Sequence, residues 1–116
     1  MALEAKAIKR WAQGSPRKVR LVADLIRGKS VEDAINTLHF STKHASKVCE
    51  ETLRSAISNL QNAKESGRIE PSNVYIKTIT VDGGPVAKRI LPAPMGRAFR
   101  VRKRTNHLTI VVFEKE

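Results

Sequence analysis

The chain of 116 residues has a single cysteine, Cys49, and only five aromatic residues. One cysteine cannot form a disulfide within the chain, and such a composition is typical of a reducing compartment. With 41% hydrophobic residues but few rings, the chain can bury a small, mainly aliphatic core. The length predicts a single domain that covers residues 1–116. The aromatic residues are Trp11, Phe40, Tyr75, Phe99 and Phe113.

Long hydrophobic runs and acidic residues are both scarce. No apolar segment approaches the roughly 18 residues of a membrane span, and residues 1–11 lack the apolar centre of a signal peptide. We therefore expect a soluble, intracellular protein. Only 11 acidic residues stand against 22 lysines and arginines, for a formal net charge of +11. A pI near 10.4 predicts a polyanionic partner, and DNA, RNA and an anionic membrane all meet that requirement.

Residue patterns for metal binding and catalysis are missing. The histidines and Cys49 lack zinc-ligand spacing, and Cys49 falls in an apolar helical stripe that is typical of a core position. The adjacent acid pairs at 32–33 and 50–51 do not face one another on a helix. The Gly83-Gly84-Pro85 turn lacks the phosphate-loop pattern. We expect no metal site, no cofactor and no enzymatic activity. The histidines are His39, His44 and His107.

The strongest positive feature is the run from residue 83 to residue 104, which has seven basic residues and no acid. Its glycines and prolines exclude a long helix, and strand-like segments flank it at 73–81 and 107–113. Two strands joined in this way predict one very long β-hairpin. Its basic residues are Lys88, Arg89, Arg97, Arg100, Arg102, Lys103 and Arg104. Its tip is expected at Pro92, Ala93, Pro94, Met95 and Gly96.

The reach of this hairpin is expected to exceed the body of the protein. Each arm should project about 30 Å, whereas a compact domain of this size has a radius of gyration of about 13 Å. Two strands alone are marginally stable in water, so we expect the hairpin to be ordered by what it inserts into. Arg100, Arg102 and Arg104 alternate and would share a face suited to phosphates, while Phe99 would stack on a base or pack. The alternative is a disordered basic loop.

The remaining segments predict a body of strands and helices. A strand is expected at 3–11, a turn at Gln13-Gly14, and helices at 16–27, 31–38 and 41–66, where apolar residues recur at helical spacing. The impure alternation within 73–81 indicates either a β-bulge or two partly covered faces. The expected helix caps are Ser15, Ser30 and Ser41 at the starts and Gly28 and Gly67 at the ends.

A second basic cluster lies at the start of the helix expected at 16–27. Arg17, Lys18 and Arg20 crowd its first turns, where cations oppose the helix dipole. A phosphate bound at the helix N-terminus would offset this cost. A solvated basic face is the alternative interpretation.

Three segments carry a family resemblance: SPRKVRLVADLIRGK (15–29), VDGGPVAKRILPAPMGRA (81–98) and KRTNHLTIVV (103–112). In this order, and over nearly the whole chain, they resemble the bacterial large-subunit ribosomal protein 22 family. The resemblance implies an α+β fold, with three helices packed on a small three-stranded antiparallel sheet and a long protruding hairpin. The body would comprise residues 1–82 and 105–116, and the hairpin residues 83–104.

The same resemblance implies a cytoplasmic, ribosome-bound structural protein that binds 23S rRNA and aids subunit assembly. Its hairpin would line the peptide exit tunnel, with the tip beside large-subunit protein 4 and the nascent peptide nearby. The tip departs from the family, which usually carries a basic residue at Ala93, often alanine at Pro94 and commonly a basic residue at Met95. This tip is therefore less charged and stiffer.

The resulting hypothesis is an rRNA-binding protein in which the hairpin neutralises converging phosphates and Arg17, Lys18 and Arg20 anchor the body. About seven contacts predict that log affinity falls with log salt at a slope of roughly −5 to −6. The alternative is a free-standing nucleic-acid-binding regulator, but the helix at 16–27 lacks obvious base-reading asparagine or glutamine. A peripheral membrane protein would need a basic amphipathic helix, whereas here the basic residues concentrate in the hairpin.

Overall fold

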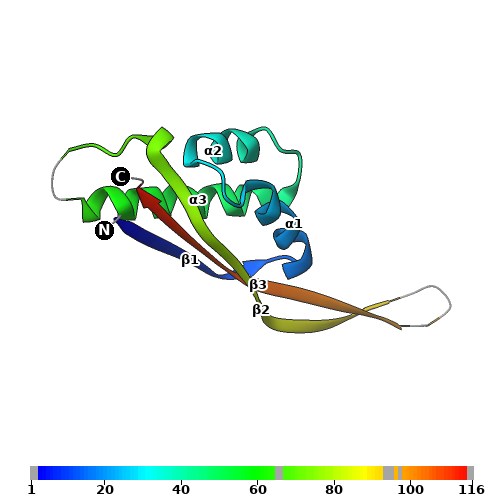
Figure 1. Cartoon of the computed structure of the whole chain (residues 1–116). Helices are drawn as coiled ribbons and strands as arrows, with labels where there is room; N and C mark the ends of the chain where they lie inside the picture. The colour runs from blue at the N-terminus through cyan, green and yellow to red at the C-terminus, as the bar shows by residue number, and fades with distance from the viewer. Residues whose placement is uncertain (1–2, 65–66, 93–95, 97, 115–116) are drawn as a thin grey trace.

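The protein folds as three helices on one face of a three-stranded antiparallel sheet, which confirms the predicted α+β class (Figure 1). The computed structural model describes residues 3–64, 67–92, 96 and 98–114. The sheet has the order β1-β3-β2. The elements are β1 (Glu4–Gln13), α1 (Pro16–Ile26), α2 (Val31–His39), α3 (His44–Ala63), the short 3₁₀ helix η1 (Pro71–Asn73), β2 (Val74–Pro92) and β3 (Ala98–Glu114).

The helix boundaries follow the sequence signals at α1 and α2 but differ at α3. Ser30 accepts a hydrogen bond from the Asp33 N–H (3.4 Å), as predicted for a cap. Ser15 occupies the N-cap position of α1 without a side-chain cap. The prediction that Ser41 opens α3 is wrong, because its hydroxyl accepts from the Lys43 N–H (3.3 Å) in a turn before the helix. The predicted extension to residue 66 is also wrong, since the backbone is already extended at Lys64.

Strand β1 runs further than the sequence indicated. The turn predicted at Gln13-Gly14 begins one residue later, because Gln13 still pairs with Thr105 of β3. Gly14 turns the chain with φ +129°, and its N–H donates to the Arg104 carbonyl (3.0 Å). A register shift between Lys9 and Ala12 marks a bulge. The chain therefore enters α1 directly beside β3.

Two register shifts divide β2. The first lies between Ile76 and Thr78 and explains the impure alternation, because residues on both sides of the bulge are buried. Of the two interpretations that the sequence left open, the bulge is confirmed. The second shift lies between Gly83 and Val86, where the body passes into the hairpin. There the Thr105 hydroxyl donates to the Pro85 carbonyl (2.7 Å).

The core is mainly aliphatic and lies between the helices and the inner face of the sheet. Leu53 and Leu60 of α3 and Ile110 of β3 belong to this core and are fully buried. Cys49 is part of this core as predicted, and burial raises the pKa of its thiol to about 11. Three buried polar residues were not predicted: Ser46, Thr52 and Asn106.

Beyond the body, β2 and β3 continue as a two-stranded ribbon (Figure 1). Pairing runs from Val86 with Arg104 to Pro92 with Ala98, as expected for the long hairpin. The radius of gyration of 17.3 Å exceeds the roughly 13 Å of a compact domain of this length, and the longest dimension is 65 Å. Among the described residues, no helix is long and apolar enough to cross a membrane.

Candidate nucleic-acid interface

The two basic clusters of the sequence meet in a groove of about 720 Å³ at the base of the hairpin. We call it the basic groove. Lys18 comes from α1, whereas Lys103 and Arg104 come from β3, and all three are exposed. No acidic residue lines the groove among the described parts of the chain. Three cations around one concave surface are suited to phosphate groups. The lining residues are Gln13, Gly14, Ser15, Lys18, Ala87, Lys103, Arg104 and Thr105.

The backbone at the start of α1 contributes less to this groove than the sequence suggested. Pro16 has no N–H, and the N–H groups of Lys18 and Val19 both donate to the Ser15 carbonyl (3.2 and 3.3 Å). These amides are therefore already engaged at the helix start. The cationic side chains of the groove are therefore better placed to attract a phosphate than these two amides are.

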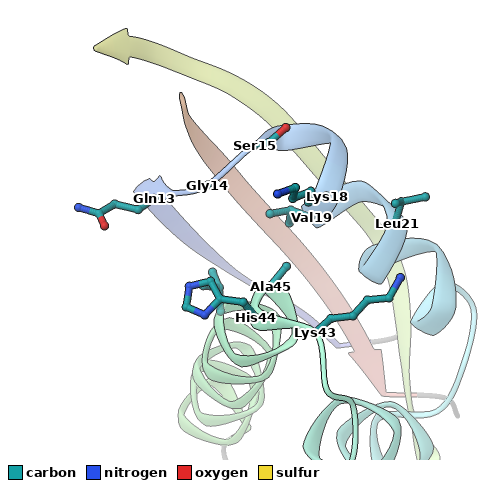
Figure 2. Close-up of a pocket in the computed structure, with 10 residues that line it drawn as sticks. Gln13, Gly14, Ser15, Lys18, Val19, Leu21, Lys43, His44 and Ala45 are labelled. Carbon is teal, nitrogen blue, oxygen red and sulfur yellow. The ribbon is translucent and has the colours of Figure 1, made fainter. Parts of the chain in front are cut away.

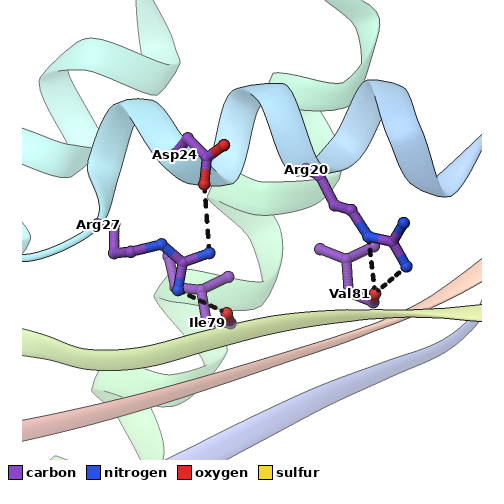
Figure 3. Close-up of polar contacts among 5 residues, drawn as sticks. All are labelled: Arg20, Asp24, Arg27, Ile79 and Val81. Carbon is purple, nitrogen blue, oxygen red and sulfur yellow. Dashed lines mark hydrogen bonds and ion pairs between the residues drawn. The ribbon is translucent and has the colours of Figure 1, made fainter.

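Arg20 has a role within the fold that sequence reasoning did not show. Its guanidinium donates two hydrogen bonds to the Val81 carbonyl, from Nη2 at 2.9 Å and from Nε at 3.2 Å (Figure 3). Seven residues further on, at the C-cap of α1, Arg27 donates to the Ile79 carbonyl at 2.9 Å and to Asp24 at 3.4 Å. These arginines hold α1 on β2, close to the point where the hairpin leaves the body. Arg17 is exposed on the same helix.

The basic residues of the hairpin are carried by the paired strands. Lys88 is exposed and lies opposite Arg102, and Arg100 lies opposite Ile90. Arg89 pairs with Val101, so the register positions of the cations fall along both strands of the ribbon. The predicted site residue Arg97 and the tip residues Ala93, Pro94 and Met95 lie outside the described residues. Gly96 is described and has φ +74°, as suits a turn.

An apolar cavity of about 440 Å³ adjoins the basic groove between α1 and α3. It shares Gln13, Gly14, Ser15 and Lys18 with the groove. Figure 2 shows Lys18 and Val19 of α1 above His44 and Ala45 at the start of α3. Lysine stems on an apolar wall can keep their ammonium groups in solvent. The cavity thus extends the groove into a surface that is basic at its rim and apolar at its floor.

Asn106 supports the groove from below and is a residue that sequence reasoning missed. It is fully buried, and its Nδ2 donates to the carbonyls of Gly14 (3.2 Å) and Ala12 (3.4 Å). Its Oδ1 has no hydrogen-bond partner among the described residues. In the sequence, Asn106 only precedes the strand expected at 107–113, so the sequence offered no signal for this role.

Chemistry other than polyanion binding finds no support in the described residues. No group of three or more histidine, cysteine, aspartate or glutamate side chains in these parts of the chain could hold a metal ion. Glu50 of α3 instead binds Arg54 (2.9 Å) and lies 3.4 Å from His39. The hydrogen bond from Arg54 is the main cause that lowers the pKa of Glu50. This cluster is an ion pair on the helix surface.

Comparison with known proteins gives one consistent family. The family model described as ribosomal protein L22p/L17e matches residues 7–113. The chain is 53% identical to large ribosomal subunit protein uL22 of Chlorobaculum tepidum over 114 residues, which cover 98% of the chain and 96% of that protein. It is 54% identical to the protein of the same name from Flavobacterium johnsoniae, over 84% of the chain and 72% of that protein. For the Chlorobium phaeobacteroides protein the identity is 52%, over 95% and 94%.

Proposed function

Because the chain belongs to the ribosomal protein L22p/L17e family, we propose that it binds 23S rRNA with its basic hairpin and with the basic groove. Members of this family are structural, non-catalytic constituents of the large ribosomal subunit. The protein is accordingly a ribosome-bound component of the cytoplasm. Through these RNA contacts the protein would aid assembly of the subunit, and its hairpin would line the peptide exit tunnel.

The observation that carries the proposal is the convergence of Lys18 with Lys103 and Arg104 across the basic groove. An RNA backbone that enters the groove would meet cations from the body and from the hairpin at once. The contact would also fix the direction in which the hairpin leaves the body. Arg17, Lys18 and Arg20 would anchor the body to the RNA. Arg20 would also hold α1 in place through its hydrogen bonds to the Val81 carbonyl.

The hairpin would act as an insert between rRNA segments. It extends the molecule to 65 Å, and its residues 83–104 carry seven basic residues and no acid. Phosphates on neighbouring RNA segments repel one another, and a narrow cationic ribbon between them lowers that repulsion. In this way the protein would stabilise the folded rRNA and aid assembly. The hairpin would then line the exit tunnel, with residues 92–96 at the constriction near large-subunit protein 4 and the nascent peptide.

Filter binding of the full chain to extracted 23S rRNA, measured over a range of salt concentrations, tests this proposal. The wild-type chain should show a slope of log affinity against log salt of roughly −5 to −6. Replacing Lys18, Lys103 and Arg104 together by alanine should make the slope less negative by about 2 to 3. The matched control removes three exposed cations that do not line the groove: Lys29, Lys47 and Arg68.

The control variant has the same net charge as the groove variant. A difference between their salt slopes therefore reports the position of the cations and not the total charge. The control should change the slope less than the groove variant does. A wild-type slope of only about −2 would overturn the proposed mechanism. Equal effects of the two variants would show that the basic groove is not a contact site.

A further inference from the structure

A second exposed feature lies on β1 beside the basic groove. Trp11 is 62% exposed although it is the one tryptophan of the chain. It lines a cavity of about 380 Å³ together with Ile8, Arg10, Asp82, His107 and Thr109. We call this set the Trp11 platform. Ile8, 44% exposed, adds to the open apolar surface at this cavity, and an exposed apolar patch suggests a ligand that covers it.

The backbone holds Trp11 in an unusual conformation. Its φ is +59°, in the left-handed region that bulky side chains rarely adopt, within the bulge between Lys9 and Ala12. The backbone N–H of Trp11 donates to Nδ1 of His107 (3.1 Å), and the two rings meet nearly at right angles with centroids 5.0 Å apart. Backbone strain of this kind concentrates at functional positions. The bulge and His107 together present the indole ring to solvent.

The residues around Trp11 can bind the phosphate and the base of a nucleotide. Arg10 is exposed next to the ring and can bind a phosphate, while the carboxylate of Asp82 can accept hydrogen bonds from the amino groups of a base. The indole face can stack on any base, because every base has a π-face. Asp82 lies opposite His107 in the β2–β3 register, so the polar group and the aromatic pair belong to one surface.

The platform lies near the basic groove along both β1 and β3. Trp11 lies two positions from Gln13 on β1, and His107 lies two positions from Thr105 on β3; both Gln13 and Thr105 line the groove. Two residues of a strand span about 7 Å. We propose that the Trp11 platform stacks an unpaired base of the rRNA strand whose phosphates occupy the basic groove. This inference rests on the proposed function and adds base recognition to phosphate binding.

Tryptophan fluorescence of the full chain tests the inference directly, because the emission comes from Trp11 alone. Saturation with extracted 23S rRNA should quench the emission and shield the ring from acrylamide. Inorganic polyphosphate, which carries the charge but no base, should bind and leave the emission nearly unchanged. Equal emission with RNA and with polyphosphate would overturn the inference.

Variants give a second readout. Trp11→Asn keeps the left-handed backbone accessible, because asparagine adopts it readily, but removes the ring. Its affinity for 23S rRNA should fall about 5- to 100-fold while the salt slope stays that of the wild type, since no charge is lost. Trp11→Phe should retain most of the affinity. The matched control is Phe40→Ala, which removes another exposed ring, 80% accessible, that lines neither site.

The outcomes separate the two proposals. If Trp11→Asn binds 23S rRNA with the affinity and the salt slope of the wild type, the base-stacking inference is wrong and the proposed function remains intact. A shallow salt slope for the wild-type chain would overturn both. Incorporation of Trp11→Asn into large subunits can be measured by sucrose-gradient sedimentation. If this incorporation is poor although RNA leaves the Trp11 emission unchanged, Trp11 contacts a protein and the base-stacking inference is wrong.

Discussion

The side-chain amide of Asn106 donates a hydrogen bond to the Gly14 carbonyl at 3.2 Å and thereby ties the end of β1 to the base of the hairpin. Gly14 lines the same groove as Lys18 of α1 and Arg104 of β3. The Gly14 N–H also donates to the Arg104 carbonyl, so the buried amide is one of the contacts that set the relative position of the two basic clusters.

Replacing Asn106 by alanine should lower the free energy of unfolding by about 1–3 kcal/mol. The substitution leaves the carbonyls of Ala12 and Gly14, the first of them buried, without the Nδ2 donor. Urea denaturation followed by circular dichroism measures the change. Asn62→Ala on the exposed face of α3 is the matched control and should shift stability by less than about 0.5 kcal/mol. Equal shifts for both variants would show that the Asn106 bonds do not support the fold.

Gly84→Ala should destabilise the protein, whereas Gly83→Ala should not. A Cβ at Gly84 would overlap the Thr105 hydroxyl and approach Nε2 of His107 to 3.3 Å, while a Cβ at Gly83 would meet nothing within 4 Å. Overpacking of this kind costs about 1–3 kcal/mol. Thermal unfolding of both variants measures the difference. An unfolding midpoint of Gly84→Ala that matches that of Gly83→Ala would contradict the close approach at this bulge.

We expect Arg20 to affect the stability of the fold and Arg17 to affect the salt dependence of RNA binding. Arg20→Ala removes two hydrogen bonds to Val81 and should lower the free energy of unfolding by about 1–2 kcal/mol. Arg17→Ala should leave stability unchanged and make the salt slope of RNA binding less negative by about one. Urea denaturation and salt-dependent filter binding on both variants measure these effects. If only Arg17→Ala lowered the stability, the structural role given to Arg20 would be wrong.

The pH dependence of stability should contain a contribution from Glu50. The Arg54 hydrogen bond holds the pKa of the Glu50 carboxyl below its ordinary value of 4.5 in the folded protein. The stabilisation is therefore present above pH 4.5 and is lost as the pH falls through the lower, folded pKa. In Arg54→Ala this loss should be smaller. Unfolding midpoints in urea between about pH 6 and pH 3 compare the two proteins, and identical profiles would show that the pair does not contribute.

The sequence predicted the elements that depend on local patterns. Apolar spacing and the Ser15-Pro16 start were sufficient for α1, and the glycines and prolines of residues 83–104 were sufficient for the hairpin. The start of α3 was misplaced, because the hydroxyl of Ser41 forms a turn as readily as a cap.

The site could be predicted only in its parts. Lys18 and Arg104 were each identified as basic residues in a cluster, but their meeting depends on the order β1-β3-β2, which no local pattern encodes. Trp11 gave no signal, because its position in a bulge with φ +59° follows from pairing with β3 and not from its own residue type. The bonds from Arg20 to Val81 likewise depend on the packing of α1 on β2.

The central claim is that the hairpin and the basic groove contact 23S rRNA. Crosslinking of protein to RNA in cell lysate, after sucrose-gradient sedimentation, tests it most directly. The account predicts co-migration with the large subunit, and crosslinks to 23S rRNA from peptides that contain Lys18 or residues 83–104. Crosslinks from other surfaces alone, or migration at the top of the gradient, would contradict it.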